Sequence, residues 1–441
     1  MSQLALLGGP KIVNCEIGNM FDWPIVNDKM EDAALSVLRN RNMSGTDITK
    51  KFEKEFAAWH GMDYGIGFSS GTASLHSAMY GAGVGIGDEI IAPSITYWAT
   101  CAQALSLGAS VVFADIDPNT LCIDPKDIER KITERTKAIM VVHYLAMPAD
   151  MDAIMAIARK HGIKVIEDVS HAHGALYKGK MVGTFGDAAG FSLMTGKSFA
   201  IGEGGMMLTN DKSIYERALL FGHYGRHSEI ENEELKKGIG LPWGGYKYRM
   251  HQMSSAIGIE QIKKYPAEIA EIDKAMNYFW DLLEGVPGIK AHRPAKDSGS
   301  TMGGWYAAHG LYKSEELGGL SVKRFSEAVA AEGVSCAAGC NRALHKHPLF
   351  SAIDVYGYGK ATQNAHLPEG VDNSQEKVSL PVSESVQGRT FSLPWFKHFR
   401  KDVIEQHANA FKKVVENYRE LLSGDDVETS DGEWGLTARK K

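Results

Sequence analysis

The chain has 441 residues, of which 44% are hydrophobic and 23% charged, and its formal net charge is −6. This composition is typical of a soluble globular enzyme with more than one domain, and the negative charge gives no reason to expect a nucleic-acid partner. No apolar run is long enough to predict a membrane-spanning helix, and the N-terminal stretch is broken too early by Gly8, Gly9 and Pro10 to be a signal peptide. Five scattered cysteines without metal-site spacing predict reduced thiols in a cytoplasmic protein, with no bound metal.

An N-terminal arm is expected over residues 1–30, followed by helical spacing from Asp28 and a helix over about residues 50–60. Short apolar strands then alternate with helices, one of them expected over residues 96–107. The predicted strands cover residues 64–68, 89–92, 110–114, 137–144, 163–166, 188–193 and 205–208. This alternation predicts an α/β domain with a mostly parallel sheet that is covered by helices on both faces.

The composition and the pattern of predicted elements change after a long helical region at 250–283, where Pro287-Gly288 interrupts the regular pattern. We therefore predict a large domain with its arm at 1–286, a smaller α+β domain at 287–422, and a disordered tail at 423–441.

Two segments with little regular pattern, 221–248 and 341–390, are expected to shape a substrate pocket. The second is expected to be a long surface excursion. Candidate pocket residues in the two segments are His223, Tyr224 and His345.

Lys197 stands among small and apolar residues in the stretch FSLMTGKSFAIGEGG, with no carboxylate after it until Glu203. An ammonium that loses hydration there favours the neutral amine, which can form a Schiff base. A lysine that reaches the surface along its apolar stem is the commoner alternative for any single lysine.

Ligands bind at the carboxyl ends of the strands in an open parallel sheet, and two motifs fall there. Ser69-Ser70-Gly71-Thr72 lies where a strand meets a helix, so its N–H groups could hold a phosphate, with a plain helix N-cap as the alternative. Glu167-Asp168 ends an apolar strand, and alternation points the two carboxylates to opposite sides. One of them could hold a proton on a ring nitrogen, with a cap for the next turn as the alternative.

Three further side chains fit the same edge. Tyr97 could stack on an aromatic ring, Ser192 could donate to a phosphate, and His171 lies three residues after Asp168. A core aromatic and a structural histidine are the commoner readings of Tyr97 and His171 alone. Together with Lys197, these parts predict a site for pyridoxal 5′-phosphate (PLP), which needs a Schiff-base lysine, a partner for its ring nitrogen and a phosphate site.

The ordered motifs SSGTASLHSAM, DEIIAPSITYWAT, VIEDVSHAHGA, FSLMTGK and GEGGMMLTND resemble those of the PLP-dependent sugar and cyclitol aminotransferases of the DegT/StrS type. The resemblance covers about residues 5–420. It implies the aspartate-aminotransferase-like fold (PLP fold type I) and a homodimer with a shared active site. It also implies amino transfer from L-glutamine or L-glutamate to a keto-sugar or keto-cyclitol, as in antibiotic biosynthesis.

The same resemblance implies roles for individual residues. Lys197 would carry the Schiff base and move the proton, and Asp168 would pair with the pyridine nitrogen. His171 would reach the ring hydroxyl, and Tyr97 would stack on the ring.

The phosphate would be held by Gly71, Thr72 and Ser192. Lys247 stands where the family commonly has an asparagine that the partner subunit donates, and it could serve the phosphate as a point charge.

The segments FGHYGRH, CNRALHKHPLF and RTFSLPWF look most like the scyllo-inosose branch of the family. Lys197 argues against the family's dehydratases, in which a histidine replaces the lysine. Two alternatives stay open: a different PLP-dependent reaction (elimination, racemisation or cyclisation) on the same scaffold, and a PLP-binding regulator without turnover.

Overall fold

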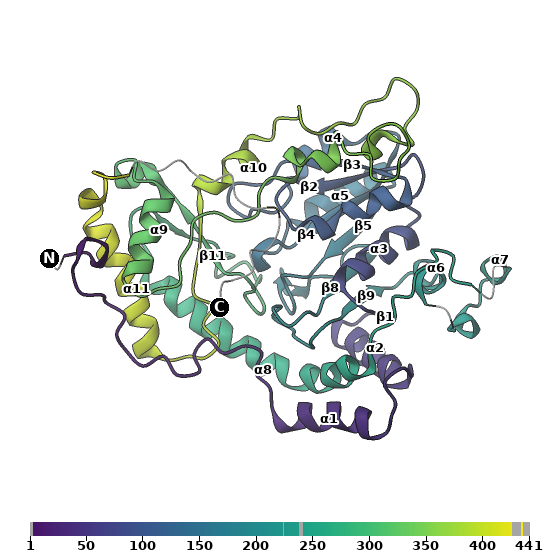
Figure 1. The fold of residues 1–441 in the computed structure, drawn as a ribbon, viewed down its shortest axis with the longest axis horizontal. Coiled ribbons are helices and arrows are strands. Elements are labelled where there is room, and N and C mark those ends of the chain that lie inside the picture. Colours follow the sequence, from purple (N-terminus) through teal and green to yellow (C-terminus); the bar gives the residue numbers. More distant parts are fainter. Residues whose placement is uncertain (1–2, 224, 238–240, 426–433, 435–441) are drawn as a thin grey trace.

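The computed structural model describes residues 3–223, 225–237, 241–425 and 434 (Figure 1). Its centre is a seven-stranded sheet in the order β1-β9-β8-β5-β4-β2-β3. The strands are β1 (Tyr64–Phe68), β2 (Glu89–Pro93), β3 (Ser110–Ala114), β4 (Thr136–Val142), β5 (Lys164–Asp168), β8 (Ala188–Ser192) and β9 (Gly205–Thr209). β9 runs antiparallel to both of its neighbours, and the other pairs are parallel. The predicted mostly parallel sheet is confirmed.

Successive residues of the strands face two different apolar cores, as the period of two requires. Ile91, Ile139 and Val165 belong to the core beneath α2 (Asp47–His60), α5 (Met151–His161) and α8 (Gln252–Leu282). Their neighbours Ile90 and Ile166 belong to the core beneath α3 (Gly71–Gly81) and α6 (Lys212–Gly222). Helices thus cover both faces of the sheet, as expected.

A second, antiparallel sheet follows α8 and contains β10 (Ile289–Ala291), β11 (His309–Tyr312) and β12 (Thr390–Ser392). It packs with α9 (Val322–Ala331) and α11 (Lys401–Glu416). α8 runs from α1 (Asp28–Arg39) and α2 toward this smaller sheet (Figure 1). The smaller α+β part is confirmed, whereas the boundary near residue 287 stays a prediction.

The helix expected over residues 96–107 is instead two 3-10 turns, Trp98–Thr100 and Ala102–Leu107. Cys101 separates them with a non-helical backbone. The first turn lets the Thr100 hydroxyl reach Asp168 in the neighbouring part of the sheet. Tertiary hydrogen bonding has overridden local helical spacing here.

Most of the predicted tail at 423–441 lies outside the described residues. Within the described part, the Asp425 carboxylate accepts hydrogen bonds from the backbone N–H and the hydroxyl of Ser321. The guanidinium carbon of Arg342 lies 4.1 Å from the centroid of the Trp434 ring, so the two side chains pack together. No helix among the described residues is both long and apolar enough to cross a membrane, and the described residues hold no group of three potential metal ligands.

The segment 341–390 covers the open edge of the large sheet. Gln363 Nε2 donates to the carbonyl of Val111 at 2.6 Å, and its Oε1 accepts from the N–H of Val111 at 3.2 Å. Gln375 Oε1 accepts from the N–H of Phe113 at 3.0 Å. Two glutamine side chains therefore take the place of a further strand on β3, which protects an edge that would otherwise pair with other chains.

Replacing the buried Gln363 with leucine leaves both polar groups of Val111 without their partner. Because an unsatisfied buried group costs about 1–3 kcal/mol, we expect the free energy of unfolding in urea to fall by at least that amount. Lys360→Leu, at an exposed position of the same segment, is the matched control and should leave it nearly unchanged. Equal stabilities of the two variants would contradict the edge-capping role.

Candidate active site

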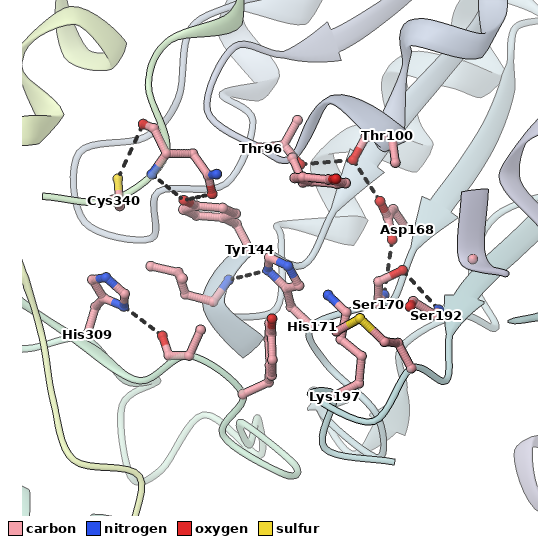
Figure 2. Close-up of a pocket in the computed structure, with 18 of the residues that line it drawn as sticks. Thr96, Thr100, Tyr144, Asp168, Ser170, His171, Ser192, Lys197, His309 and Cys340 are labelled. Carbon is pink, nitrogen blue, oxygen red and sulfur yellow. Dashed lines mark hydrogen bonds between the residues drawn. The ribbon is translucent and has the colours of Figure 1, made fainter. Parts of the chain in front are cut away.

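A cavity of about 570 Å³ lies at the carboxyl ends of the strands of the large sheet and is closed by residues of the smaller sheet and α9 (Figure 2). Seven of the eight predicted cofactor residues line it: Gly71, Thr72, Tyr97, Asp168, His171, Ser192 and Lys197. Lys247, the eighth, is not among the residues that line this cavity. The structure thus brings seven scattered sequence positions together in one cavity, and their roles stay a prediction.

Asp168 is the last residue of β5, and its side chain is 5% exposed. Its Oδ2 accepts from Thr100 Oγ1 at 2.7 Å, and its Oδ1 accepts from the N–H of Ser170 at 3.0 Å. A further hydroxyl, that of Thr96, lies 2.9 Å from Thr100 Oγ1. These bonds fix the orientation of the carboxylate at the wall of the cavity.

The neighbouring carboxylate, Glu167, faces away from the cavity. It accepts from His143 Nε2 at 3.0 Å and from the N–H groups of Gly183, Phe185 and Gly186. Strand alternation predicted that the two acids point to opposite sides, and the structure assigns the cavity to Asp168.

Lys197 is 8% exposed, and its Nζ lies 4.3 Å from the centroid of the Tyr306 ring. Its own carbonyl accepts from Trp23 Nε1 at 2.9 Å, so the N-terminal arm holds the loop that carries it. No carboxylate of the described residues forms an ion pair with it. Burial lowers the pKa of Lys197 to about 8, against a smaller opposing effect of the Asp168 charge.

This pKa predicts how the apoprotein reacts with an aromatic aldehyde. Below pH 8 the neutral amine is the minor form, so we expect the rate of Schiff-base formation to rise about tenfold per pH unit and then to level off. Stopped-flow absorbance between pH 6 and pH 11 measures it. A rate that keeps rising to pH 10 would mean that burial does not lower this pKa.

His171 is held by the strained turn at Tyr144–Ala146. Leu145 and Ala146 have φ of 50° and 71°, in the left-handed region, and such strain is common at functional sites. The N–H of Leu145 donates to His171 Nδ1 at 3.3 Å, which leaves the ring proton on Nε2. Burial, with the Lys197 charge, lowers the pKa of His171 well below its usual value. His171 is therefore a neutral side chain with one N–H to donate.

The start of α3 is where a phosphate site is predicted. The hydroxyl of Ser70 caps the helix by accepting from the N–H of Ala73 at 3.1 Å, so the alternative reading as an N-cap is confirmed, and the phosphate site stays a prediction. The first N–H groups of a helix otherwise lack helical partners and favour anions. A Cβ added to Gly71 would lie 2.6 Å from the Cβ of Ser192, so only glycine allows this close approach.

Sequence reasoning missed the wall that the smaller part of the chain contributes. Its members include Tyr306, His309, Lys323, Cys340 and Asn341. They come from a long stretch that approaches the strand ends only after folding. No spacing of residues in the sequence identifies them as members of the site.

Two residues expected in the substrate pocket are not there. His345 is buried and lies 2.6 Å from Ser94 Oγ and 3.1 Å from Glu384 Oε1. His223 is buried with its ring edge against Phe68. Tyr224 lies outside the described residues, and only the ends of the 341–390 segment, at Asn341 and Gln387, reach the cavity. The segment mainly covers the sheet edge instead.

The cavity suits the predicted cofactor. A buried lysine with no ion-pair partner among the residues described suits condensation with an aldehyde, and a buried, oriented carboxylate suits a protonated ring nitrogen. The glycine-based start of α3 beside Ser192 matches a phosphate.

The DegT/DnrJ/EryC1/StrS aminotransferase family matches the chain over residues 24–412. The chain is 32% identical to the L-glutamine:scyllo-inosose aminotransferase of Streptomyces griseus over 439 residues, which cover 95% of this chain and 99% of that protein. An aminotransferase from Psychrobacter cryohalolentis superposes with a TM-score of 0.77 at 27% identity, over 91% of this chain and all of that one. The 3-amino-5-hydroxybenzoic acid synthase superposes with a TM-score of 0.75 at 25% identity, over 90% and 99%.

Proposed function

Because the chain belongs to the PLP-dependent DegT/DnrJ/EryC1/StrS aminotransferase family and has Lys197 rather than the histidine of the family's dehydratases, we propose that it moves an amino group from L-glutamine or L-glutamate to a keto-sugar or keto-cyclitol. The observation that carries the proposal is a buried lysine without a counter-ion in one cavity with Asp168. The Streptomyces griseus relative, named for L-glutamine and scyllo-inosose, supports that donor and a cyclitol acceptor.

PLP supplies an aldehyde that condenses with amines and a ring that withdraws electrons. Lys197 would hold the cofactor through its amine. When that amine is free, its lowered pKa of about 8 would let it take the proton from the α-carbon of the donor as a base and return it as an acid. Asp168 would hold the proton on the ring nitrogen, His171 would donate from Nε2 to the ring hydroxyl, and Tyr97 would supply a flat aromatic surface against the ring.

We further propose that the protein acts as a homodimer. Lys247 does not line the cavity of its own subunit, which supports the prediction that it serves the phosphate of the partner's site. An Lys247→Ala variant should then bind PLP more weakly although Lys247 lies outside the cavity of its own chain.

An absorption titration tests the function. The PLP-loaded protein is mixed separately with L-glutamine, L-glutamate and L-alanine. We expect glutamine or glutamate to replace the visible band with that of the pyridoxamine form, and scyllo-inosose or a keto-sugar to restore it. A band that no amino acid discharges would overturn the transaminase proposal in favour of a different PLP-dependent reaction or a regulator.

A further inference from the structure

The cavity has two sides with different chemistry. Figure 2 shows Asp168 and Ser192 on one side and His309 and Cys340 on the other, with His171 and Tyr144 between them. The residues of the first side are those that we expect to bind the cofactor. The second side is built by the start of α9 and by residues 338–341.

Lys323, the second residue of α9, lines this second side and is half-buried. Glu327 lies one turn further along the helix but bonds Arg324, at 3.5 Å. Within the part of the chain that the structure describes, no ion pair, hydrogen bond or ring contact involves the Lys323 ammonium. Among the described residues that line the cavity, Lys197 and Lys323 are the two lysines, and none is an arginine. With Lys197 committed to the cofactor, Lys323 is the cation left for a substrate.

Partial burial of an ammonium costs hydration that an anionic ligand can replace with a charge-assisted hydrogen bond. The plain alternative is a lysine whose stem packs on the wall while its head stays in water. A second donor without a partner among the described residues, on the same side of the cavity, favours the anionic ligand.

Asn341 supplies that donor. Its backbone N–H donates to Tyr144 Oη at 3.3 Å, so the Tyr144 hydroxyl proton is free to donate to Asn341 Oδ1 at 2.7 Å. This arrangement fixes the amide with its oxygen on Tyr144. The Nδ2 donors have no partner among the described residues, and Asn341 lines the cavity.

Ring contacts place this amide close to the reacting groups. The Tyr144 ring lies 5.7 Å from that of His171, and the His171 ring lies 4.8 Å from that of Tyr306, over which Lys197 Nζ sits. Asn341 is thus connected to Lys197 through the rings of Tyr144, His171 and Tyr306.

We propose that Lys323 and Asn341 form a subsite for a carboxylate of the substrate. The proposal rests on the proposed function, because it concerns what reacts at the same cavity. A cation and an amide donor together match the two acceptor oxygens of a carboxylate. The amino donor always carries this group, and an acidic acceptor would carry it too.

Calorimetric binding of glutarate, an unreactive dicarboxylate, to the PLP-loaded protein tests the subsite. We expect Lys323→Met to weaken binding at least tenfold, Lys323→Arg to retain most of it, and Asn341→Ala to weaken it about threefold to tenfold. The visible PLP band should be unchanged in all three. Lys313→Met removes a charge from the smaller part of the chain outside the cavity and is the matched control. Equal glutarate affinity of the Lys323→Met and control proteins, or no glutarate binding by the unaltered protein, would overturn the subsite.

The two half-reactions then show whether the carboxylate that binds here belongs to the amino donor or to the acceptor. A higher L-glutamate concentration for half-discharge of the band in Lys323→Met assigns the subsite to the donor. A higher concentration of an acidic ketone for restoring the band assigns it to the acceptor, and no change in either contradicts the proposal. Glutarate binding needs no turnover, so its outcome stays distinct from failure of the transaminase function.

Discussion

A Lys197→Ala protein is expected to lose at least about a thousandfold in transamination rate and to lose covalent attachment of PLP altogether. The side chain serves twice, as the amine that holds the cofactor and as the acid–base group that moves the proton, and each role alone is worth about 10²–10⁴-fold. Of the two lysines among the described residues that line the cavity, Lys197 is the buried one and Lys323 is only half-buried.

Two measurements check this result: the visible spectrum with PLP and the rate of band discharge by L-glutamine. Lys178→Ala, at an exposed lysine, is the control and should match the unaltered protein. Small exogenous amines should restore part of the rate in Lys197→Ala, because they can carry the proton in its place. Turnover at the unaltered rate would refute the role of Lys197.

Asp168→Asn is the second variant with a large expected effect. Asparagine keeps the shape of the side chain but lacks the negative charge that holds a proton on the ring nitrogen, so electron withdrawal by the ring weakens. We expect the rate to fall by about 10²–10³-fold. PLP should still attach, because Lys197 and the predicted phosphate site at Gly71 are untouched.

The matched control is Thr100→Val, which removes one hydrogen bond to the same carboxylate but keeps its charge. Loss of a single bond should cost only about threefold to tenfold. Single-turnover rates compare the variants. If Thr100→Val were as slow as Asp168→Asn, the charge of Asp168 would not be the important property.

The part of this architecture that could be predicted from sequence is the part that local chemistry determines. Alternating strands and helices predicted the parallel sheet, and the ends of its strands supplied Gly71, Tyr97, Asp168 and Ser192. Strand periodicity also predicted that Glu167 and Asp168 face opposite ways. Periodicity could not predict which of the two carboxylates faces the cavity, because the N–H groups that donate to Glu167 belong to residues 183–186, outside the strand.

The rest depends on contacts between distant segments. Trp23 reaches the carbonyl of Lys197 across 174 residues, and Asn341 reaches Tyr144 across 197. Gln363, in the short 3-10 helix Thr362–Asn364, completes the edge of β3. Such pairs carry no local pattern of hydrophobicity or turn chemistry, so single-sequence reasoning assigned the segment to a substrate pocket.

The most direct test of the account is chemical trapping of the cofactor. The PLP-loaded protein is reduced with borohydride, digested, and mapped by mass spectrometry. The account predicts one modified peptide, the one that contains Lys197. A label on another lysine, or no label at all, would contradict it.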